Sequence, residues 1–414
     1  MQTSRNAKPS TPATDCISAQ ACIVGGGPAG MMLALLLARA GIDVVLIEKH
    51  GDFLRDFRGD TIHPSTLAVI QELGLLDEFL RLPHQRVTSL SGNLGDTTVR
   101  VADFSRLPGR CKFLAFMPQW DFLDFLAARA RQYPNFHLHL QTRAHALRFD
   151  GDRVAGVWAE TPDGELEIRA AVTVAADGRD SVLRASAGLV PMTVGAPMDV
   201  LWLRLTKRAS DPHETFGYVR GGRIIALIDR GEYWQCAYVI AKGTFEELRG
   251  QGIEGLQSSI AATVPFLADR TGELQSWDDV KLLTVRVDRL RRWYRAGFLC
   301  IGDAAHAMSP IGGVGINLAI QDAVAAGNRL APKLLRGALT TADLAAVQRR
   351  REFAARATQA LQVFIGRNVI GRVLEAGHSP LLARVPRVAR ALPFLPRVLG
   401  RVVAFGLRPE RVRT

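Results

Sequence analysis

The sequence is poor in cysteine, and its five cysteines are scattered without a CxxC pair. This spacing argues against a disulfide framework and against a structural zinc site, and it suits a reduced, cytoplasmic protein. No uninterrupted apolar run approaches the roughly 18 residues that a membrane span needs. The stretch MMLALLLARAG is interrupted by Arg39 and predicts a buried helix instead.

Apolar residues are also scarce in the first 18 positions, MQTSRNAKPSTPATDCIS, which lack the apolar centre of a signal peptide. We expect residues 1–18 to form a flexible tail. Acidic residues are scarce at the other end, where residues 331–414 hold 16 Lys and Arg against 4 Asp and Glu. That balance of +12 equals the net charge of the whole chain, so the first 330 residues are close to neutral. With 414 residues, the chain is long enough for two domains.

The segment ACIVGGGPAGMMLALLLARAGIDVVLIEKH predicts a strand, a glycine turn, a helix and a second strand. Gly25, Gly27 and Gly30 follow the spacing GxGxxG, which combines a tight turn, close approach to a pyrophosphate and close helix–sheet packing. The helix N-terminus offers free N–H groups to the phosphates. Glu48 ends the second strand, where a carboxylate can bind ribose hydroxyls. The segment predicts a dinucleotide site but does not distinguish NAD from FAD.

Two further segments follow buried strands. In AAVTVAADGRDSVLRASAG, Asp177 and Gly178 make a turn, Ser181 can cap the next helix, and Arg184 lies on its first turns. A capped turn of this kind is common and assigns no function by itself. The second segment, FLCIGDAAHAMSPIGGVGINLAIQDA, runs from a strand through a glycine-rich loop into a helix.

The glycine-rich segment has two interpretations. In the first, Asp303 and His306 are catalytic or metal-binding, but no HxH, HExxH or second acidic cluster accompanies them, so we predict no metal site. In the second, Asp303 binds a hydroxylated chain, and the glycines let backbone N–H groups approach a flat, partly anionic ring at a helix N-terminus. The second interpretation fits better, and it leaves His306 a structural role.

In this order, the three motifs resemble those of the group A flavoprotein monooxygenases, the family of para-hydroxybenzoate hydroxylase. GGGPAG is similar to the family's first fingerprint, DGRDSVLR to its DG motif, and GDAAH with SP and GGVGIN to its GD motif. RDFRGDTIHPSTLAVIQELGLLDEF resembles the family's arginine-bearing segment, and FMPQWDFLDFLAARA resembles its segment with a flavin-contacting glutamine. The resemblance covers residues 22–335 and is weakest over 192–280.

The resemblance implies an α/β fold in which a Rossmann-like FAD-binding domain carries an inserted, mostly antiparallel β-sheet substrate domain and a helical C-terminal region. We expect the FAD-binding domain at 19–190 and 281–340, the substrate domain at 191–280, and the basic helical region at 341–414. It also implies that Asp177 and Arg184 brace the FAD site and the approach of the pyridine nucleotide.

An extended FAD is implied, with the first glycines at the pyrophosphate, a carboxylate at the adenosine ribose and the later glycines along the isoalloxazine ring. The implied cofactor-binding residues are Gly25, Gly27, Pro28, Ala29, Gly30, Glu48, Lys49, Arg58, Gln119, Ala144, Asp177, Asp303, Pro310, Gly312, Gly313, Gly315 and Asn317.

The implied activity is hydroxylation of an aromatic or other electron-rich, largely apolar small molecule by NAD(P)H and O2, through a flavin C4a-hydroperoxide. The protein would position the substrate and exclude water, so no side chain is assigned as a catalytic residue. The chain has no second GxGxxG in a strand–helix context, so NAD(P)H is expected in a transient groove.

Residues 191–280 predict strands, and few charges lie in the strand EYWQCAYVI, which favours an apolar, aromatic-sized substrate. In EYWQCAYVI, alternate side chains point to opposite faces, and the sequence does not decide which face covers the flavin. A halogenase of related fold is an alternative, although its WxWxIP element is missing here. A non-hydroxylating oxidoreductase of the same fold and a flavin-binding protein without turnover are two more.

The basic C-terminal region alternates apolar residues, arginines and prolines. The simplest interpretation is a solvated, arginine-rich helical face. A second hypothesis is peripheral contact with a membrane surface that carries a quinone-like substrate. No recognisable nucleic-acid module accompanies the charge, so no nucleic-acid partner is predicted.

Overall fold

The structure is a computed structural model that describes residues 15–54, 61–212, 216–377 and 379–413. Its first sheet follows the order β19–β20–β11–β1–β2–β8, and β10 and β9 extend it from β11. The strands of this sheet are β1 (Asp15–Val24), β2 (Val44–Ile47), β8 (Phe136–His139), β9 (Arg143–Asp150), β10 (Arg153–Thr161), β11 (Gly164–Ala175), β19 (Tyr294–Arg295) and β20 (Phe298–Cys300).

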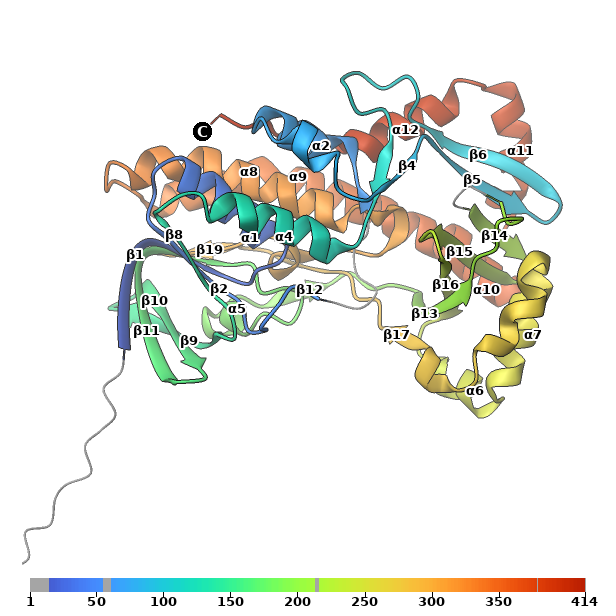
Figure 1. The fold of residues 1–414 in the computed structure, drawn as a ribbon, viewed down its shortest axis with the longest axis horizontal. Helices are drawn as coiled ribbons and strands as arrows, with labels where there is room; N and C mark the ends of the chain where they lie inside the picture. The colour runs from blue at the N-terminus through green and yellow to red at the C-terminus, as the bar shows by residue number, and fades with distance from the viewer. Residues whose placement is uncertain (1–14, 55–60, 213–215, 378, 414) are drawn as a thin grey trace, which may run out of the picture.

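The core of the first sheet is parallel, because β1 pairs in parallel with β2 and β11, and β2 with β8. Parallel strands are covered on both faces and therefore need continuous apolar runs, which ACIV and VVLI provide. The helix α1 (Pro28–Arg39) joins β1 to β2 and is buried from Ala29 to Ala38. Figure 1 shows α1, α4 (Gln119–Ala130) and α8 (Gly315–Leu334) together on one side of this sheet. The predicted Rossmann-like α/β domain is confirmed.

The strand β1 begins earlier than the predicted tail allows. Asp15–Ser18 belongs to β1 and pairs with Leu166–Arg169 of β11. The polar sequence DCIS carries no strand pattern of its own, so its conformation comes from backbone pairing with a long partner strand. Residues 1–14 of the predicted tail lie outside the described residues.

The second sheet has seven strands in the order β17–β13–β16–β15–β14–β5–β6. All its pairs are antiparallel except β14 with β5, so the predicted mostly antiparallel sheet forms. Two of its strands precede the predicted range of 191–280. The strands are β5 (Ser89–Leu94), β6 (Thr97–Asp103), β13 (Met198–Thr206), β14 (Phe216–Arg220), β15 (Arg223–Asp229), β16 (Tyr233–Ala241) and β17 (Lys281–Leu283).

One face of the second sheet is covered by helices. Trp234, Cys236 and Tyr238 of β16 pack in a core with residues of α7 (Ile253–Thr263) and of the 3-10 segment η1 (Pro265–Glu273). Figure 1 shows α7 and α6 (Phe245–Gly250) on the outer side of this sheet. Because side chains alternate along a strand, Gln235 and Ala237 lie on the opposite face.

The remaining elements form two three-stranded sheets, short connecting helices and the C-terminal helices. The strands are β3 (Thr61–Ile62), β4 (Gln85–Val87), β7 (Leu114–Phe116), β12 (Pro191–Thr193), β18 (Asp288–Leu290) and β21 (His306–Ala307). The helices are α2 (Pro64–Glu72), α3 (Leu76–Phe79), α5 (Val182–Ser186), η2 (Trp277–Asp279), η3 (Gly302–Ala304), η4 (Ile311–Gly313), α9 (Thr341–Ile365), η5 (Gly366–Gly371), α10 (Arg372–Ala376), α11 (Pro380–Ala391) and α12 (Leu395–Phe405). The C-terminal region is helical as predicted. In the described part of the chain, no helix is long and apolar enough to cross a membrane.

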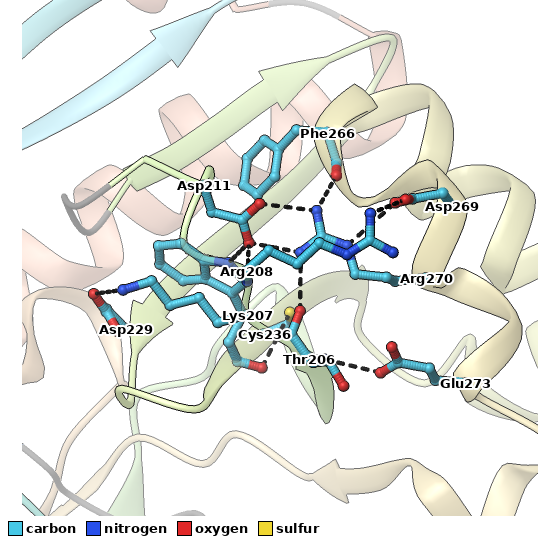
Figure 2. Close-up of polar contacts among 11 residues, drawn as sticks. Thr206, Lys207, Arg208, Asp211, Asp229, Cys236, Phe266, Asp269, Arg270 and Glu273 are labelled. Atoms are coloured by element: carbon cyan, nitrogen blue, oxygen red, sulfur yellow. Dashed lines mark hydrogen bonds and ion pairs between the residues drawn. The ribbon is translucent and has the colours of Figure 1, made fainter.

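A buried ion pair anchors the helical cover of the second sheet. Arg270 of η1 donates to both carboxylate oxygens of Asp211, at 2.6 and 3.0 Å, and Figure 2 shows the two side chains facing each other. The indole Nε1 of Trp234 donates to the same carboxylate at 2.9 Å. Burial raises the pKa of Asp211, but hydrogen bonds from Arg270, from the Arg208 backbone and from Trp234 outweigh it and lower the pKa to about 2.

We predict that Arg270→Ala lowers the free energy of unfolding by about 3–5 kcal/mol, because it leaves the Asp211 carboxylate buried without its cation. The matched control is Arg208→Ala. It removes an exposed pair with Asp269 and should cost no more than about 1 kcal/mol. Urea unfolding measures both variants. Because the pKa of Asp211 is lowered from 3.8 to about 2, the stabilisation is present above pH 3.8 and disappears as the pH falls through about 2. Equal losses in the two variants at pH 7 would contradict this account.

Candidate cofactor site

The loop between β1 and α1 leaves a helix N-terminus open to a ligand. Gly27 is the N-cap of α1, has no side chain to bond the first N–H groups, and precedes Pro28 at the first helical position. Backbone N–H groups at such an end bind anions because they have no partner within the helix. Pro28 and Ala29 therefore stand where the sequence places them, in the first turn behind the glycines.

The three glycines of this loop serve two different purposes. A Cβ on Gly25, whose φ is +107°, would lie 2.5 Å from the carbonyl oxygen of Ala176, and one on Gly30 would lie 2.0 Å from that of Gly25. Both contacts are impossible for a larger residue, so these glycines allow the backbone segments to touch. A Cβ on Gly27 would meet nothing within 4 Å. The space in front of the helix is therefore free of protein and fits a pyrophosphate.

Glu48, directly after β2, is buried and braces the same loop. Its Oε2 accepts a hydrogen bond from the Gly26 N–H at 2.8 Å, and its Oε1 accepts from the His50 N–H at 3.1 Å. The carboxylate is thereby fixed beside the glycine turn, where a ribose is expected to lie. Lys49, the next residue, is exposed.

Ala144 differs from the other predicted cofactor residues, because the structure places it inside a strand. It is the second residue of β9, pairs with Ala159 of β10 and packs, half-buried, against the core of the first sheet. Two residues earlier, the Thr142 N–H donates to the carbonyl of Glu48 at 2.8 Å, so β9 begins close to the backbone of that residue. A methyl side chain can donate no hydrogen bond, and the expected cofactor contact of Ala144 stays a prediction.

Packing brings the three motifs together at one edge of the sheet. A Cβ on Gly302 would lie 3.1 Å from the Cβ of Ala29, and one on Gly25 would lie 2.9 Å from the Asp177 Cα. The buried Arg184 connects the second and third motifs, donating to the carbonyls of Arg179 at 2.6 Å and Ala304 at 3.2 Å. These segments follow β1, β11 and β20, and the carboxyl ends of parallel strands are where ligands bind in such sheets.

Asp303 and His306 have separate partners. The Asp303 carboxylate is partly exposed and lies 3.6 Å from Nη2 of Arg179. His306 is buried, and its Nε2 lies 2.6 Å from the carboxylate of Asp322. No group of three or more potential metal ligands occurs in the described residues. The structural interpretation of His306 agrees with this arrangement.

The Asp322 carboxylate holds the turn at the third motif. Its Oδ2 also accepts from the Gly302 N–H at 3.1 Å, and its Oδ1 accepts from Nε of Arg351 at 3.0 Å. Burial raises the pKa of Asp322, but the charges and hydrogen bonds of His306 and Arg351 outweigh it and lower the pKa. Neither Asp322 nor Arg351 belongs to the predicted site. They lie on two different helices, so their spacing in the sequence forms no motif. The available signal is Asp322 itself, because a single acidic residue on the apolar face of a helix indicates a buried ion pair.

The loop of residues 310–315, hereafter the 310–315 loop, ends at the N-terminus of α8. Gly312 and Gly313 have φ values of +79° and +61°, and Gly315 opens the helix without a capping side chain in front of it. The amide of Asn317 connects the loop to the start of α2. Its Oδ1 accepts hydrogen bonds from the His63 N–H at 3.0 Å and from Thr66 Oγ1 at 2.7 Å. A helix of 20 residues thus presents an uncapped N-terminus beside a glycine loop, which favours a partly anionic ring there.

His63 is a site residue that the sequence motifs do not reveal. Its Nδ1 lies 2.8 Å from the carbonyl oxygen of Val403 in α12, and because a carbonyl only accepts, Nδ1 carries the hydrogen. A Cβ on Gly313 would lie 3.8 Å from its Nε2. Burial lowers the pKa of His63 to about 4, despite the nearby carbonyls of Val403 and Gly313, so the ring is neutral at pH 7. The sequence signal that could have indicated His63 is its position immediately before Pro64, which begins α2.

Two predicted residues remain. Gln119 is buried and begins α4, immediately after β7 and Pro118. Arg58 lies outside the described residues. Three features fit an extended FAD. The open helix end at Gly27 fits the pyrophosphate, and the carboxylate of Glu48 fits the ribose. The uncapped N-terminus of α8 beside the 310–315 loop fits the ring.

A family model described as an FAD binding domain matches residues 18–361. The chain belongs to this family and is an FAD-dependent monooxygenase with NAD(P)H as its co-substrate.

Among known proteins, the chain is 36% identical over 409 residues to 6-methylpretetramide 4-monooxygenase of Streptomyces rimosus, covering 97% of this chain and 96% of the relative. Its fold is similar to that of p-nitrophenol 4-monooxygenase PnpA from Pseudomonas putida DLL-E4, with a TM-score of 0.76, 20% identity, and coverage of 96% and 100% of the two chains. It is also similar to the myxobacterial chondrochloren halogenase CndH, with a TM-score of 0.72, 20% identity, and coverage of 95% and 98%. At these identities the structural likeness concerns the fold alone.

We predict that Gly27→Ala weakens FAD binding roughly tenfold, equivalent to about 1.4 kcal/mol, because the new methyl group enters the space left for the pyrophosphate. Without FAD its stability should change by less than about 1 kcal/mol. Gly30→Ala should instead destabilise the protein itself by about 1–3 kcal/mol, because its Cβ overlaps the Gly25 carbonyl. Fluorescence titration with FAD and urea unfolding of the FAD-free protein separate the two effects. Unchanged FAD affinity in Gly27→Ala would contradict the assigned site.

Proposed function

We propose that the chain hydroxylates an aromatic, largely apolar small molecule, and that 6-methylpretetramide or a close analogue is the first compound to test. The observation that carries this proposal is the 36% identity to 6-methylpretetramide 4-monooxygenase across 97% of the chain. Identity of this extent includes the second sheet as well as the FAD-binding domain.

The face of the second sheet opposite α7 supports an apolar substrate. Val200 of β13, Ala237 of β16 and Val285 form a small buried apolar cluster on this face, with Trp202 packed against it. Gln235 is buried beside them, and its Oε1 accepts from Nε of Arg230 at 2.9 Å. Its Nε2 has no hydrogen-bond partner among the described residues. An apolar face with one open donor suits a ring that bears an acceptor oxygen.

FAD, when bound, supplies the redox chemistry that couples NAD(P)H oxidation to activation of O2. The chain contributes binding, orientation and exclusion of water. Gly25 and Gly30 allow the backbone contacts that shape the loop, and Gly27 leaves the space before the N-terminus of α1 free for the pyrophosphate. Asn317 holds the 310–315 loop against α2. The N-terminus of α8 favours negative charge at its end, and the apolar face of the second sheet keeps water away from the reacting ring.

We expect FAD-loaded protein to oxidise NADPH or NADH faster in the presence of 6-methylpretetramide, by at least roughly tenfold, because substrate binding shields and orients the reaction. The product should gain the mass of one oxygen atom, as measured by mass spectrometry. A product that gains a halogen would favour the halogenase alternative, and a product that changes only in hydrogen content would favour a reductase. A panel of simpler phenols serves as the control for substrate choice.

We further propose that the protein works in the cytoplasm. All five cysteines are free, and four of them are buried. Burial raises the pKa of Cys22 to about 12. Buried thiols of this kind are structural and need no oxidising partner, which suits a reducing compartment.

Peripheral contact with an anionic membrane surface is proposed for α11 and α12. Both helices are strongly amphipathic in sequence, and Leu381, Phe394 and Val398 are exposed apolar residues on or between them. The sequence has no acidic residue between Glu375 and Glu410, an interval that contains six arginines. Arginines beside exposed apolar side chains are the pattern of a helix that lies in a membrane interface.

We predict that the intact chain sediments with vesicles containing anionic lipid and that Phe394→Asp combined with Val398→Asp reduces binding at least roughly fivefold, because charge is placed in the apolar contact. The control is Val190→Asp, which changes an even more exposed apolar residue of the FAD-binding domain. Failure of the unmodified chain to bind anionic vesicles at low salt would refute the membrane proposal without affecting the proposed reaction.

A further inference from the structure

An apolar pocket of about 150 Å³ lies between the first turns of α8, the middle of α9 and residues 402–407. Leu361, Val402 and Leu407 mark its outer end, where these side chains are 50%, 38% and 38% exposed. Ile311 and Gly312 of the 310–315 loop also line the pocket. The pocket therefore extends from the surface of the C-terminal helices to the loop that holds the flavin, and no strand of the second sheet lines it.

One polar side chain in the wall has an unused donor. Gln321 of α8 is buried, and its Oε1 accepts a hydrogen bond from the backbone N–H of Glu410. This bond fixes the amide orientation, because an N–H group can bond only to the oxygen. The Nε2 of Gln321 has no hydrogen-bond partner within the described part of the chain. A buried donor without a partner costs about 1–3 kcal/mol, so a partner is expected from a ligand.

The other long polar side chains in the wall are already engaged. Arg351 donates to Asp322 at 3.0 Å, and Nε2 of Gln362 donates to the carbonyls of Ser309 and Ile311 at 2.9 and 2.8 Å. These bonds fix the two side chains in the wall of the pocket. A ligand would therefore meet a mostly apolar wall that carries the unpartnered amide of Gln321 and the hydroxyls of Ser65 and Thr358. A few polar groups in an apolar wall are the usual composition of a site for a small aromatic molecule.

We infer that this pocket binds one aromatic ring that carries an acceptor oxygen, with the oxygen bonded to Gln321 Nε2. The size agrees, since an apolar protein cavity of about 150 Å³ holds a benzene-sized molecule. The pocket lies behind the 310–315 loop, on the side of α9 and α12, whereas the proposed substrate face belongs to the second sheet. A role for this pocket in holding the aromatic substrate before the reaction rests on the proposed function. The binding of an aromatic ring in the pocket does not rest on it.

The probes are phenol and toluene, which have similar size but differ in the acceptor oxygen. Their binding to the FAD-loaded full chain is measured by ligand-detected NMR titration. Ala357→Phe introduces a ring from the α9 wall of the pocket and should weaken both probes more than tenfold. Ala360→Phe is the matched control, because Ala360 lies on the same helix, is exposed and does not line the pocket. This control should bind both probes as the unmodified chain does.

The hydrogen bond is tested separately by Gln321→Met, which keeps the length of the side chain and removes the donor. We expect phenol to bind roughly five- to tenfold more weakly and toluene to bind unchanged. FAD affinity and the urea midpoint of each variant show whether it is folded.

Three results would overturn the inference: no binding of either probe to the unmodified chain, equal binding to Ala357→Phe, or equal loss in Ala360→Phe. Substrate-stimulated NAD(P)H oxidation that persists while phenol fails to bind would refute the pocket and leave the proposed function intact. The converse, phenol binding without such oxidation, would refute the proposed function alone.

Discussion

The close contact between the N-terminus of α1 and the end of β1 is the constraint on which the rest of the structure depends. The carbonyl of Gly25 would lie 2.0 Å from any Cβ on Gly30, so the helix can start directly over the strand only with glycine at both places. This contact places the open N–H groups of α1 at the edge of the sheet. The turns after β11 and β20 lie at the same edge, because Gly25 packs against Ala176 and Ala29 packs against Gly302. The candidate cofactor site is the product of these three close contacts.

A second layer of interactions connects the C-terminal helices to the site. Arg351 of α9 holds Asp322 of α8, and Asp322 holds the Gly302 N–H and His306. His63, at the start of α2, lies between Val403 of α12 and the 310–315 loop. The C-terminal region is therefore more than a basic surface, because its inner side positions the turns of the candidate FAD site.

Much of the fold and most residues of the candidate site could be predicted from sequence because the motifs are local. Gly25, Gly27, Gly30 and Glu48 lie within one strand–helix–strand unit, whose backbone demands are visible in residue type and spacing. The pairing of β5 with β14 could not be predicted, because no local pattern specifies a parallel partner more than 100 residues away. The strand at Asp15–Ser18 depends likewise on a distant partner. His63, Asp322 and Arg351 act through contacts between separate helices, and their roles appear only in three dimensions.

The most direct test of the account is the origin of the oxygen atom in the product. FAD-loaded protein would be incubated with NADPH or NADH and 6-methylpretetramide under ¹⁸O₂, and the product analysed by mass spectrometry. The account predicts one ¹⁸O atom per hydroxylated product, because the activated oxygen comes from O2. A hydroxylated product without the label would show that the oxygen came from water and would contradict the assignment as a monooxygenase.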